Sequence, residues 1–336
     1  MHSKIIQYPV NIRVNFAFCL DNHEIHINRC LALAKKAIGF VAPNPQVGSV
    51  IVKNGHVVAE GYHQSFGKPH AEINAIANLS EGILPKDCIL YVNLEPCNHQ
   101  GKTPPCSHAI VNAGFKHVVV GMVDPNKQVN GSGIDYLESN GVKVTKNVLQ
   151  PECLFSNRRF VLFQKESRPY IILKWAESED GYIGKEGERT EISHWDAQKI
   201  NHQWRSQEAA ILIGKNTYLS DQPKLDARHW DNNDPSKWLI WGASEIPDLD
   251  NSWNVWNNSN LPSLLESIKN KNLQSVIVEG GQKLLNSFLD AGLYDEIRVI
   301  KSKHVQMGSG IKAPQRPALN YEMKEFSKDT IFTGIK

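Results

Sequence analysis

The sequence predicts an α/β protein with two domains, the first of them a three-layer α/β/α domain. Short buried strands alternate with helical segments along the chain, which implies a sheet that helices cover on both faces. The 336 residues, 41% of them apolar, suit about two domains with one core each. The chain restarts at Arg168-Pro169 with a strand over residues 170–176 that is too apolar for the surface. We therefore expect the domain boundary near residues 150–168.

The elements of the first half follow from apolar spacing and turn signals. Ile27, Leu31 and Ile38 recur at helical spacing and predict a helix over residues 25–38. Asn54-Gly55 is a strong hairpin signal. The other predicted elements are strands 47–52 and 56–61, helix 70–78, strand 88–94, helix 106–112, strand 117–122, helix 134–140, strand 142–144 and a connecting helix over 151–165.

In the second half of the chain, the sequence again predicts strands that alternate with helices. Its expected strands cover 209–213, 238–241, 275–278 and 296–300, and its expected helices cover 264–269 and 283–290. The strand over 275–278 leads into Gly280-Gly281 before a helix, a turn that exposes backbone amides at a common place for phosphate. A tight strand-to-helix turn is the alternative, because a glycine pair alone is weak support.

Composition narrows the class of protein. The net charge is +2 with both signs interspersed, so we expect neither a nucleic-acid nor a membrane partner. No apolar run reaches the length of a membrane span. The six cysteines are unevenly spaced, which favours a reducing, cytoplasmic setting over a disulfide framework.

One motif carries the chemistry of the first half. His70-Ala71-Glu72 is followed by Pro96-Cys97 and then by Cys106. One histidine and two cysteines can supply three ligands to zinc and leave the fourth position open, as catalytic zinc sites do. Glu72 then lies where a carboxylate can move protons at the metal. This is the arrangement of the zinc deaminases that act on nucleobases; buried structural cysteines are the alternative.

The segment around the cysteines adds detail. A buried strand leads into Pro96-Cys97, so we expect a helix to start there and to place the thiolate at its N-terminus. Eight residues separate the two thiols, and they include His99 and Lys102. A cation beside a deaminase pocket suggests a substrate with a phosphate, whereas a solvated loop lysine is the simpler alternative.

This segment, Glu95 to Cys106, closely resembles the signature of the bifunctional riboflavin-biosynthesis deaminase–reductases. The resemblance extends over about residues 24–313. Its other motifs are Pro43-Asn44-Pro45-Gln46-Val47-Gly48, Gly61-Tyr62-His63, Asp124-Pro125-Asn126, Pro169-Tyr170 with Lys174, His202 with Arg205, and Val278-Glu279-Gly280-Gly281. The resemblance implies a cytidine-deaminase-like domain followed by a dihydrofolate-reductase-like domain. We expect an extension, poorly ordered, over residues 1–22, a zinc deaminase domain over 23–150, a connecting helix over 151–168 and an NADPH-dependent reductase domain over 169–336.

The resemblance also implies roles for individual residues. One zinc per chain would be held by His70, Cys97 and Cys106, with Glu72 as the catalytic residue. The residues expected to contact NADPH are Ala176, Ser193, Thr217, Asp221 and Gly281. The residues expected to contact the substrate are Asn44, His63, His99, Lys102, Arg189, Arg205, Leu225, Arg228 and Glu279. The guanidinium groups of Arg205 and Arg228 would suit its ribose phosphate. Three positions, Arg189, Glu191 and Gln222, depart from the family pattern.

The expected activity has two steps. A diaminopyrimidinone ribosylamine phosphate is deaminated by hydrolysis, and NADPH then reduces its ribosyl chain to ribityl. The expected partner is this small molecule, and the expected assembly is a homo-oligomer. Two alternatives stay open: a monofunctional nucleobase or tRNA-adenosine deaminase with an inactive or unrelated second domain, and a zinc-stabilised binding module. The second alternative requires a fourth protein ligand, for which His99 is the candidate.

Overall fold

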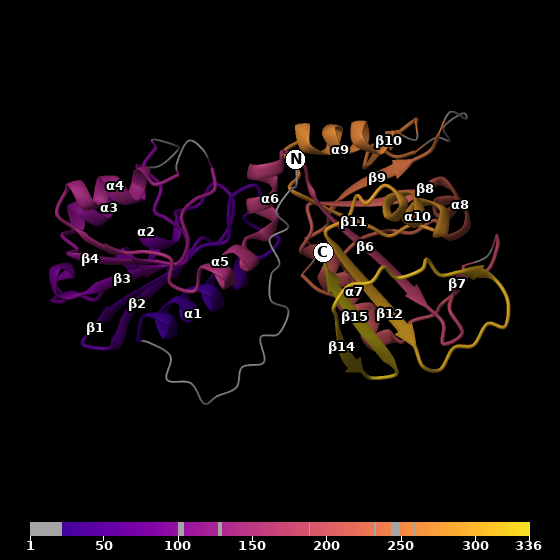
Figure 1. The fold of residues 1–336 in the computed structure, drawn as a ribbon, viewed down its shortest axis with the longest axis horizontal. Helices are drawn as coiled ribbons and strands as arrows, with labels where there is room; N and C mark the ends of the chain where they lie inside the picture. Colours follow the sequence, from indigo (N-terminus) through magenta and orange to yellow (C-terminus); the bar gives the residue numbers. More distant parts are fainter. Residues whose placement is uncertain are drawn as a thin grey trace. The chain divides into compact units, whose positions relative to one another are not determined.

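The structure is a computed structural model that describes residues 22–99, 104–126, 130–187, 189–231, 233–242, 249–258 and 260–336. It divides into two compact units, one ending at Ser167 and the other beginning at Arg168 (Figure 1). Of the extension expected over residues 1–22, only residue 22 lies within the described part. No helix within that part is long and apolar enough to cross a membrane.

The first unit is a sheet of order β2-β1-β3-β4-β5 between two helical layers (Figure 1). Its elements are α1 (Asn22–Ala34), η1 (Lys35–Ala37), β1 (Gly48–Lys53), β2 (His56–Tyr62), α2 (Ala71–Ala77), η2 (Pro85–Asp87), β3 (Ile89–Val92), α3 (Cys106–Ala113), β4 (His117–Val120), α4 (Ser132–Ser139), β5 (Lys143–Thr145), α5 (Gln150–Ser156) and α6 (Arg158–Glu166). Strand β1 is antiparallel to β2 and β3, whereas β3, β4 and β5 are parallel. The predicted three-layer arrangement and hairpin are confirmed.

The segment expected as one connecting helix is two helices, so that prediction was wrong. Helix α5 ends before Asn157, whose side chain accepts a hydrogen bond from the Gln46 N–H at 2.8 Å and donates one to the Gln46 carbonyl at 3.0 Å. Cys153, Phe160 and Val161 of these helices belong to the core of the first unit. The spacing of apolar residues could not reveal the break between α5 and α6, because the break lies at Asn157, a polar residue whose side chain binds the backbone of Gln46 in a distant loop.

The second unit is an eight-stranded sheet of order β10-β9-β8-β11-β6-β12-β15-β14, parallel from β10 to β12. Its elements are β6 (Tyr170–Glu177), β7 (Tyr182–Gly184), α7 (Trp195–Ser206), β8 (Ala210–Gly214), α8 (Lys215–Asp221), β9 (Ser236–Ile240), β10 (Trp253–Trp256), α9 (Leu261–Asn270), β11 (Ser275–Val278), α10 (Gln282–Asp290), β12 (Glu296–Ser302), β13 (Ile311–Lys312), β14 (Tyr321–Phe326) and β15 (Asp329–Ile335). Strand β15 runs antiparallel to β12 and β14. Parallel strands end at one edge of such a sheet, which is the usual place for a ligand.

Several elements of the second unit were not predicted, among them α7, α8 and the edge strand β14. Helix α7 packs Ala197, Ile200 and Trp204 against a small apolar cluster, but its buried positions also include His202 and Ser206. Helix α8 buries no residue. Strand β14 forms the edge of the sheet and exposes most of its side chains. The buried strands β6, β8, β11 and β12 were predicted because both of their faces are covered.

Candidate functional site

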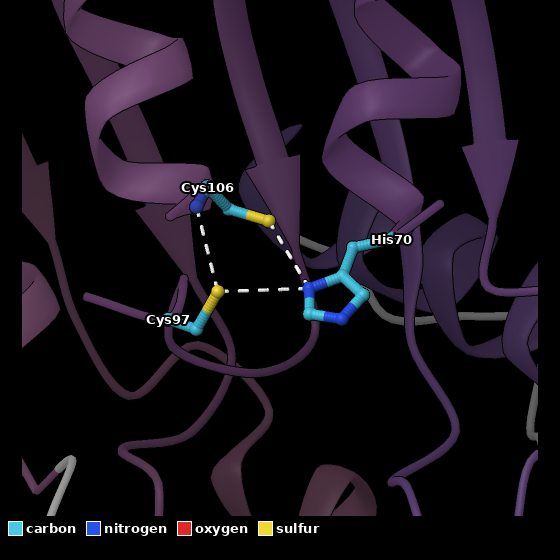
Figure 2. A group of neighbouring side chains, drawn as sticks. All are labelled: His70, Cys97 and Cys106. Carbon is cyan, nitrogen blue, oxygen red and sulfur yellow. Dashed lines mark hydrogen bonds between the residues drawn. The ribbon is translucent and has the colours of Figure 1, made fainter. Parts of the chain in front are cut away.

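Three elements of the first unit bring His70, Cys97 and Cys106 together (Figure 2). His70 precedes α2 in extended conformation, Cys106 is the first residue of α3, and Cys97 lies in the loop after β3. His70 Nδ1 is 3.3 Å from the Cys106 sulfur and 3.6 Å from the Cys97 sulfur. The ring nitrogen faces both sulfurs in Figure 2.

These distances fit a zinc ion. Zinc–sulfur bonds of about 2.3 Å and zinc–nitrogen bonds of about 2.0–2.1 Å in a tetrahedron separate nitrogen and sulfur by about 3.5 Å. Within the described residues, the group of neighbouring ligand atoms contains these three residues and not His99, which is exposed. The three donors leave a fourth position free for water or substrate. The closed site that a purely structural zinc module requires is therefore not formed by the described residues.

The sequence context of Cys97 predicted that a helix would start there, and this prediction was wrong. Helix α3 begins only at Cys106, directly after Pro105. The dipole argument still applies through space, since the Cys106 N–H points at the Cys97 sulfur at 3.4 Å. A hydrogen bond from the Cys106 thiol lowers the pKa of Cys97 to about 4, against burial, and a further bond from His70 acts in the same direction. A thiolate suited to bind metal results.

Glu72 lies in the first turn of α2, two residues after His70, and only 3% of its surface is exposed. Burial, followed by the charge of Cys97, raises the pKa of its carboxyl to about 7. A carboxyl with a pKa near neutrality can both accept and return a proton under working conditions. The structure therefore places a buried carboxyl with a near-neutral pKa in the first turn of the helix that follows His70.

Asn44 and His63 form a second layer beside His70. Asn44 Nδ2 is 3.1 Å from His63 Nε2, and His63 Nδ1 is 3.1 Å from the Pro69 carbonyl oxygen. If Nδ1 carries the proton, it donates to Pro69 while Nε2 accepts from Asn44. The His63 ring meets the His70 ring edge-on, with centroids 5.3 Å apart. His63 thus adjoins the candidate metal ligand His70, and Asn44 contacts His63, whereas Lys102 lies outside the described residues.

Glu95 is a site residue that the sequence analysis did not select. Its buried carboxylate accepts hydrogen bonds from the backbone N–H groups of Asp124, Gly131, Gly133 and Ile134, at 2.9–3.3 Å. Burial, followed by the Glu95 charge among other effects, raises the pKa of Asp124 to about 6. The sequence signal was available, since Glu95 directly precedes Pro96-Cys97.

In the second unit, the expected substrate residues Arg205 and Glu279 bind each other. Arg205 Nε and Nη2 donate to the two Glu279 oxygens at 2.9 and 2.8 Å, and Lys174 Nζ lies 3.5 Å from the same carboxylate. Burial would raise the pKa of Glu279, but Arg205 and Lys174 outweigh it and lower the pKa to about 2. Arg205 Nη1 also donates to the Asp226 carbonyl at 3.3 Å. Arg205 thus orients Glu279, and the expectation that it binds phosphate has no support in these contacts.

The expected cofactor residues gather only in part. The Gly281 N–H, which was expected to be open, donates to Thr217 Oγ1 at 2.9 Å. This bond joins the start of α10 to α8, whose last residue is Asp221. Ala176 lies near the carboxyl end of β6, and the Ser193 carbonyl accepts a bond from Gln198. Thr217 and Asp221 share α8, whereas Ala176 lies on β6 and Ser193 precedes α7.

The remaining expected substrate residues differ in exposure. Leu225 is buried in a left-handed backbone conformation with φ of 53°. Arg228 is 42% exposed and its Nε lies 2.9 Å from Asp226, so its guanidinium can still reach a ligand. Arg189 is 69% exposed and 3.7 Å from Glu191, which makes it a surface pair with little energetic weight.

Comparisons with known proteins agree with both units. Residues 20–122 match the cytidine and deoxycytidylate deaminase zinc-binding region, and residues 169–302 match the RibD C-terminal domain. A riboflavin biosynthesis protein RibD from Aquifex aeolicus is 34% identical over 316 residues, which cover 85% of this chain and 88% of that protein. The corresponding protein of Synechocystis is 42% identical over 232 residues, covering 69% of this chain and 62% of that protein.

Solved structures extend this likeness to the whole fold. A diaminohydroxyphosphoribosylaminopyrimidine deaminase/5-amino-6-(5-phosphoribosylamino)uracil reductase from Thermotoga maritima is 31% identical, with a TM-score of 0.83, over 94% of this chain and 98% of that one. A RibD structure from Acinetobacter baumannii has the same TM-score at 27% identity and the same coverage. Because the likeness spans both units, the chain belongs to the RibD family of riboflavin biosynthesis and carries its deaminase and its reductase domain.

Proposed function

We propose that this chain catalyses two successive steps of riboflavin biosynthesis. It deaminates 2,5-diamino-6-ribosylamino-4(3H)-pyrimidinone 5′-phosphate, and it then uses NADPH to reduce the ribosyl side chain to ribityl. The observation that carries the proposal is the meeting of His70, Cys97 and Cys106 beside buried Glu72, in a chain that also holds a RibD reductase domain. The presence of a RibD reductase domain in the same chain disfavours the alternative of a monofunctional deaminase.

For the first step, we assign His70, Cys97 and Cys106 as the ligands of one zinc per chain. Zinc bound there supplies Lewis acidity, which makes water a nucleophile near neutral pH. The Glu72 carboxylate takes one proton of the attacking water and passes it to the pyrimidine ring nitrogen, and it then carries the remaining proton from the added hydroxyl to the amine, which departs as ammonia. Water adds its oxygen to the ring carbon, and the bond from that carbon to the amine breaks. Asn44, His63, His99 and Lys102 are assigned to the substrate.

For the second step, the nicotinamide cofactor supplies a hydride to C1′ of the opened ribose. The Gly280-Gly281 turn suits a cofactor, because it lies at the carboxyl end of buried β11. The Glu279 carboxylate, fixed by Arg205 and Lys174, is assigned to orient the sugar. Ala176, Ser193, Thr217, Asp221 and Gly281 are assigned to NADPH, and Leu225 and Arg228 to the substrate.

The setting of the enzyme is also a proposal. The five described cysteines are all free thiols, which suits the reducing cytoplasm. A homo-oligomer stays a prediction, which sedimentation of the purified protein tests.

The proposal is tested by incubating purified protein with the diaminopyrimidinone phosphate and identifying the products by mass. Without NADPH, we expect a product in which oxygen replaces an amino group, together with free ammonia. With NADPH, the product should gain two further hydrogens. Deamination without any oxidation of NADPH or NADH would reduce the assignment to a monofunctional deaminase, and an unchanged substrate would overturn it.

A further inference from the structure

Glu95 joins three segments of the first unit at one buried carboxylate. Oε2 accepts from the N–H groups of Asp124 and Gly131 at 3.0 Å each. Oε1 accepts from Gly133 at 2.9 Å and from Ile134 at 3.3 Å. The Glu95 backbone is held as well, since its N–H donates to the Met122 carbonyl at 2.9 Å. The loop after β3 is thereby fastened to the loop after β4 and to the first turn of α4.

Helix α4 depends on this contact because it cannot cap itself. Its N-cap residue is Gly131, which has a φ of 90° and no side chain to accept from the first turn. The N–H groups that begin a helix need an acceptor, and a negative charge is favoured there. Glu95 provides both from a distant part of the sequence. The same carboxylate holds Asp124, so the cap and the loop after β4 have one common anchor.

The anchor lies next to a metal ligand in sequence and in space. Only Pro96 separates Glu95 from Cys97. A side chain at Gly133 would overlap the Pro96 carbonyl oxygen, so the first turn of α4 presses directly on the backbone that leads to Cys97. Since the proline ring also restricts its own φ, little freedom is left between the anchored carboxylate and the thiolate.

We propose that Glu95 is a positioning residue of the metal site, which sets the place of the Cys97 sulfur by fastening its loop to α4. The inference rests on the proposed role of Cys97 as a zinc ligand. Groups that orient metal ligands affect metal affinity or activity by about 10–100-fold when they are changed. Glu95→Gln is the sharpest change, because an amide has one acceptor oxygen and turns its NH₂ group toward backbone donors.

The test measures metal binding, with cobalt(II) as a spectroscopic substitute for zinc. Wild-type protein and Glu95→Gln are titrated with cobalt(II) and zinc against a chromophoric chelator, and the thiolate-to-cobalt absorption is recorded. We expect about 10–100-fold weaker metal binding, an altered thiolate band and a similar fall in deaminase kcat. Reductase activity on deaminated substrate should be unchanged, which shows that the second unit is intact, and the circular dichroism of the variant should match wild type, which shows that the first unit has folded as well.

A matched control separates positioning from simple helix capping. Asn260 caps α9 in the other unit by accepting from the Ser263 N–H at 3.0 Å. Asn260→Ala should lower the melting temperature without altering the cobalt spectrum or the deaminase. If Glu95→Gln also loses only stability and keeps wild-type metal affinity and spectrum, the positioning role is wrong.

Two further results keep the inference open to refutation. If Glu95→Gln does not fold, Glu95→Asp retains the charge on a shorter side chain, and it should fold with an intermediate metal affinity. Wild-type affinity and spectrum in Glu95→Asp would count against the inference. If wild-type protein itself binds no metal, the proposed function fails, and this outcome is distinct from equal binding by wild type and variant.

Discussion

Glu72 in the first unit and Glu279 in the second are both largely buried at the candidate sites, but their carboxyl groups have opposite surroundings. Burial, together with the charge of Cys97, raises the pKa of Glu72 to about 7. Glu279 is also largely buried, with 10% of its side chain exposed, but Arg205 and Lys174 reverse the effect of burial and its pKa falls to about 2. Burial therefore does not decide the role of a carboxyl, because neighbouring cations do. Glu72 can exchange a proton near neutral pH, whereas Glu279 acts as a fixed negative charge.

The largest expected effect follows from this difference. Glu72→Gln removes the proton carrier and should lower deaminase kcat by about 10²–10⁴-fold, with zinc and fold retained. Ammonia release gives the rate, and metal analysis gives the zinc content. Reductase activity on deaminated substrate serves as the control. Deamination at a near wild-type rate would show that the two glutamates do not differ in the way described.

The counterpart in the second unit is Glu279→Ala. Removing the carboxylate leaves Arg205 and Lys174 as buried cations without their common partner, at a cost of about 3–5 kcal/mol of stability. We expect the oxidation of NADPH by deaminated substrate to fall by at least about 10²-fold, a change of about 3 kcal/mol in the barrier. Ammonia release should be unchanged.

The matched control is Asp295→Asn, which weakens the bidentate pair of Asp295 with Arg168 at the opposite ends of the strands. This substitution should lower the stability of the second unit without changing the KM values of the reductase. If both variants lose the reductase equally, Glu279 serves only the fold.

The low pKa of Glu279 also predicts how stability depends on pH. A carboxyl with a lowered pKa stabilises the fold above its unfolded value of 4.5, and this contribution is lost as the pH falls through about 2. The full shift corresponds to about 3 kcal/mol. All eight tryptophans lie in the second unit, so their fluorescence follows its unfolding selectively. Between pH 5 and 2, Glu279→Gln should lose less stability than wild type; parallel curves would contradict the assignment.

The smallest effects concern the expected phosphate contacts, of which each unit has its own. Arg228→Ala should raise the KM of the reductase about 10-fold, because a charged hydrogen bond to phosphate contributes about 1.5–3 kcal/mol. Lys102→Ala is its counterpart and should raise the KM of the deaminase instead. Steady-state rates of both reactions for each variant decide the point. A variant that impairs both reactions would indicate damage to the fold.

Sequence reasoning went further in the first unit for a physical reason. The ligands of one metal ion must lie within a few ångströms of each other. Identifying His70, Cys97 and Cys106 as ligands of one zinc therefore also predicts that they meet in space. The buried strands were also predictable, because continuous apolar runs have few other uses. The carboxylate of Glu95 was missed although the residue directly precedes Pro96-Cys97, because its four partners are backbone amides that no sequence pattern displays.

The second unit was harder to predict because its site depends on pairs that are distant in sequence. Arg205 was expected to bind phosphate, yet its donors are directed at Glu279, 74 positions away. The Gly281 amide was expected to be open, and it is bonded to Thr217. Helix α8, which carries that threonine, has no buried face to reveal it. Residue types alone indicated the chemistry here, but not which groups neutralise each other.

Asn157 has a consequence for attempts to separate the two activities. Its side chain binds both backbone groups of Gln46, and Asn93 donates to the same carbonyl at 3.0 Å while accepting from the Gly48 N–H at 2.8 Å. The loop that begins β1 therefore needs a residue synthesised more than a hundred positions later. A gene fragment that stops at residue 150 lacks this brace, whereas one that continues to Ser167 keeps it. The shortest autonomous deaminase should accordingly include both helices α5 and α6.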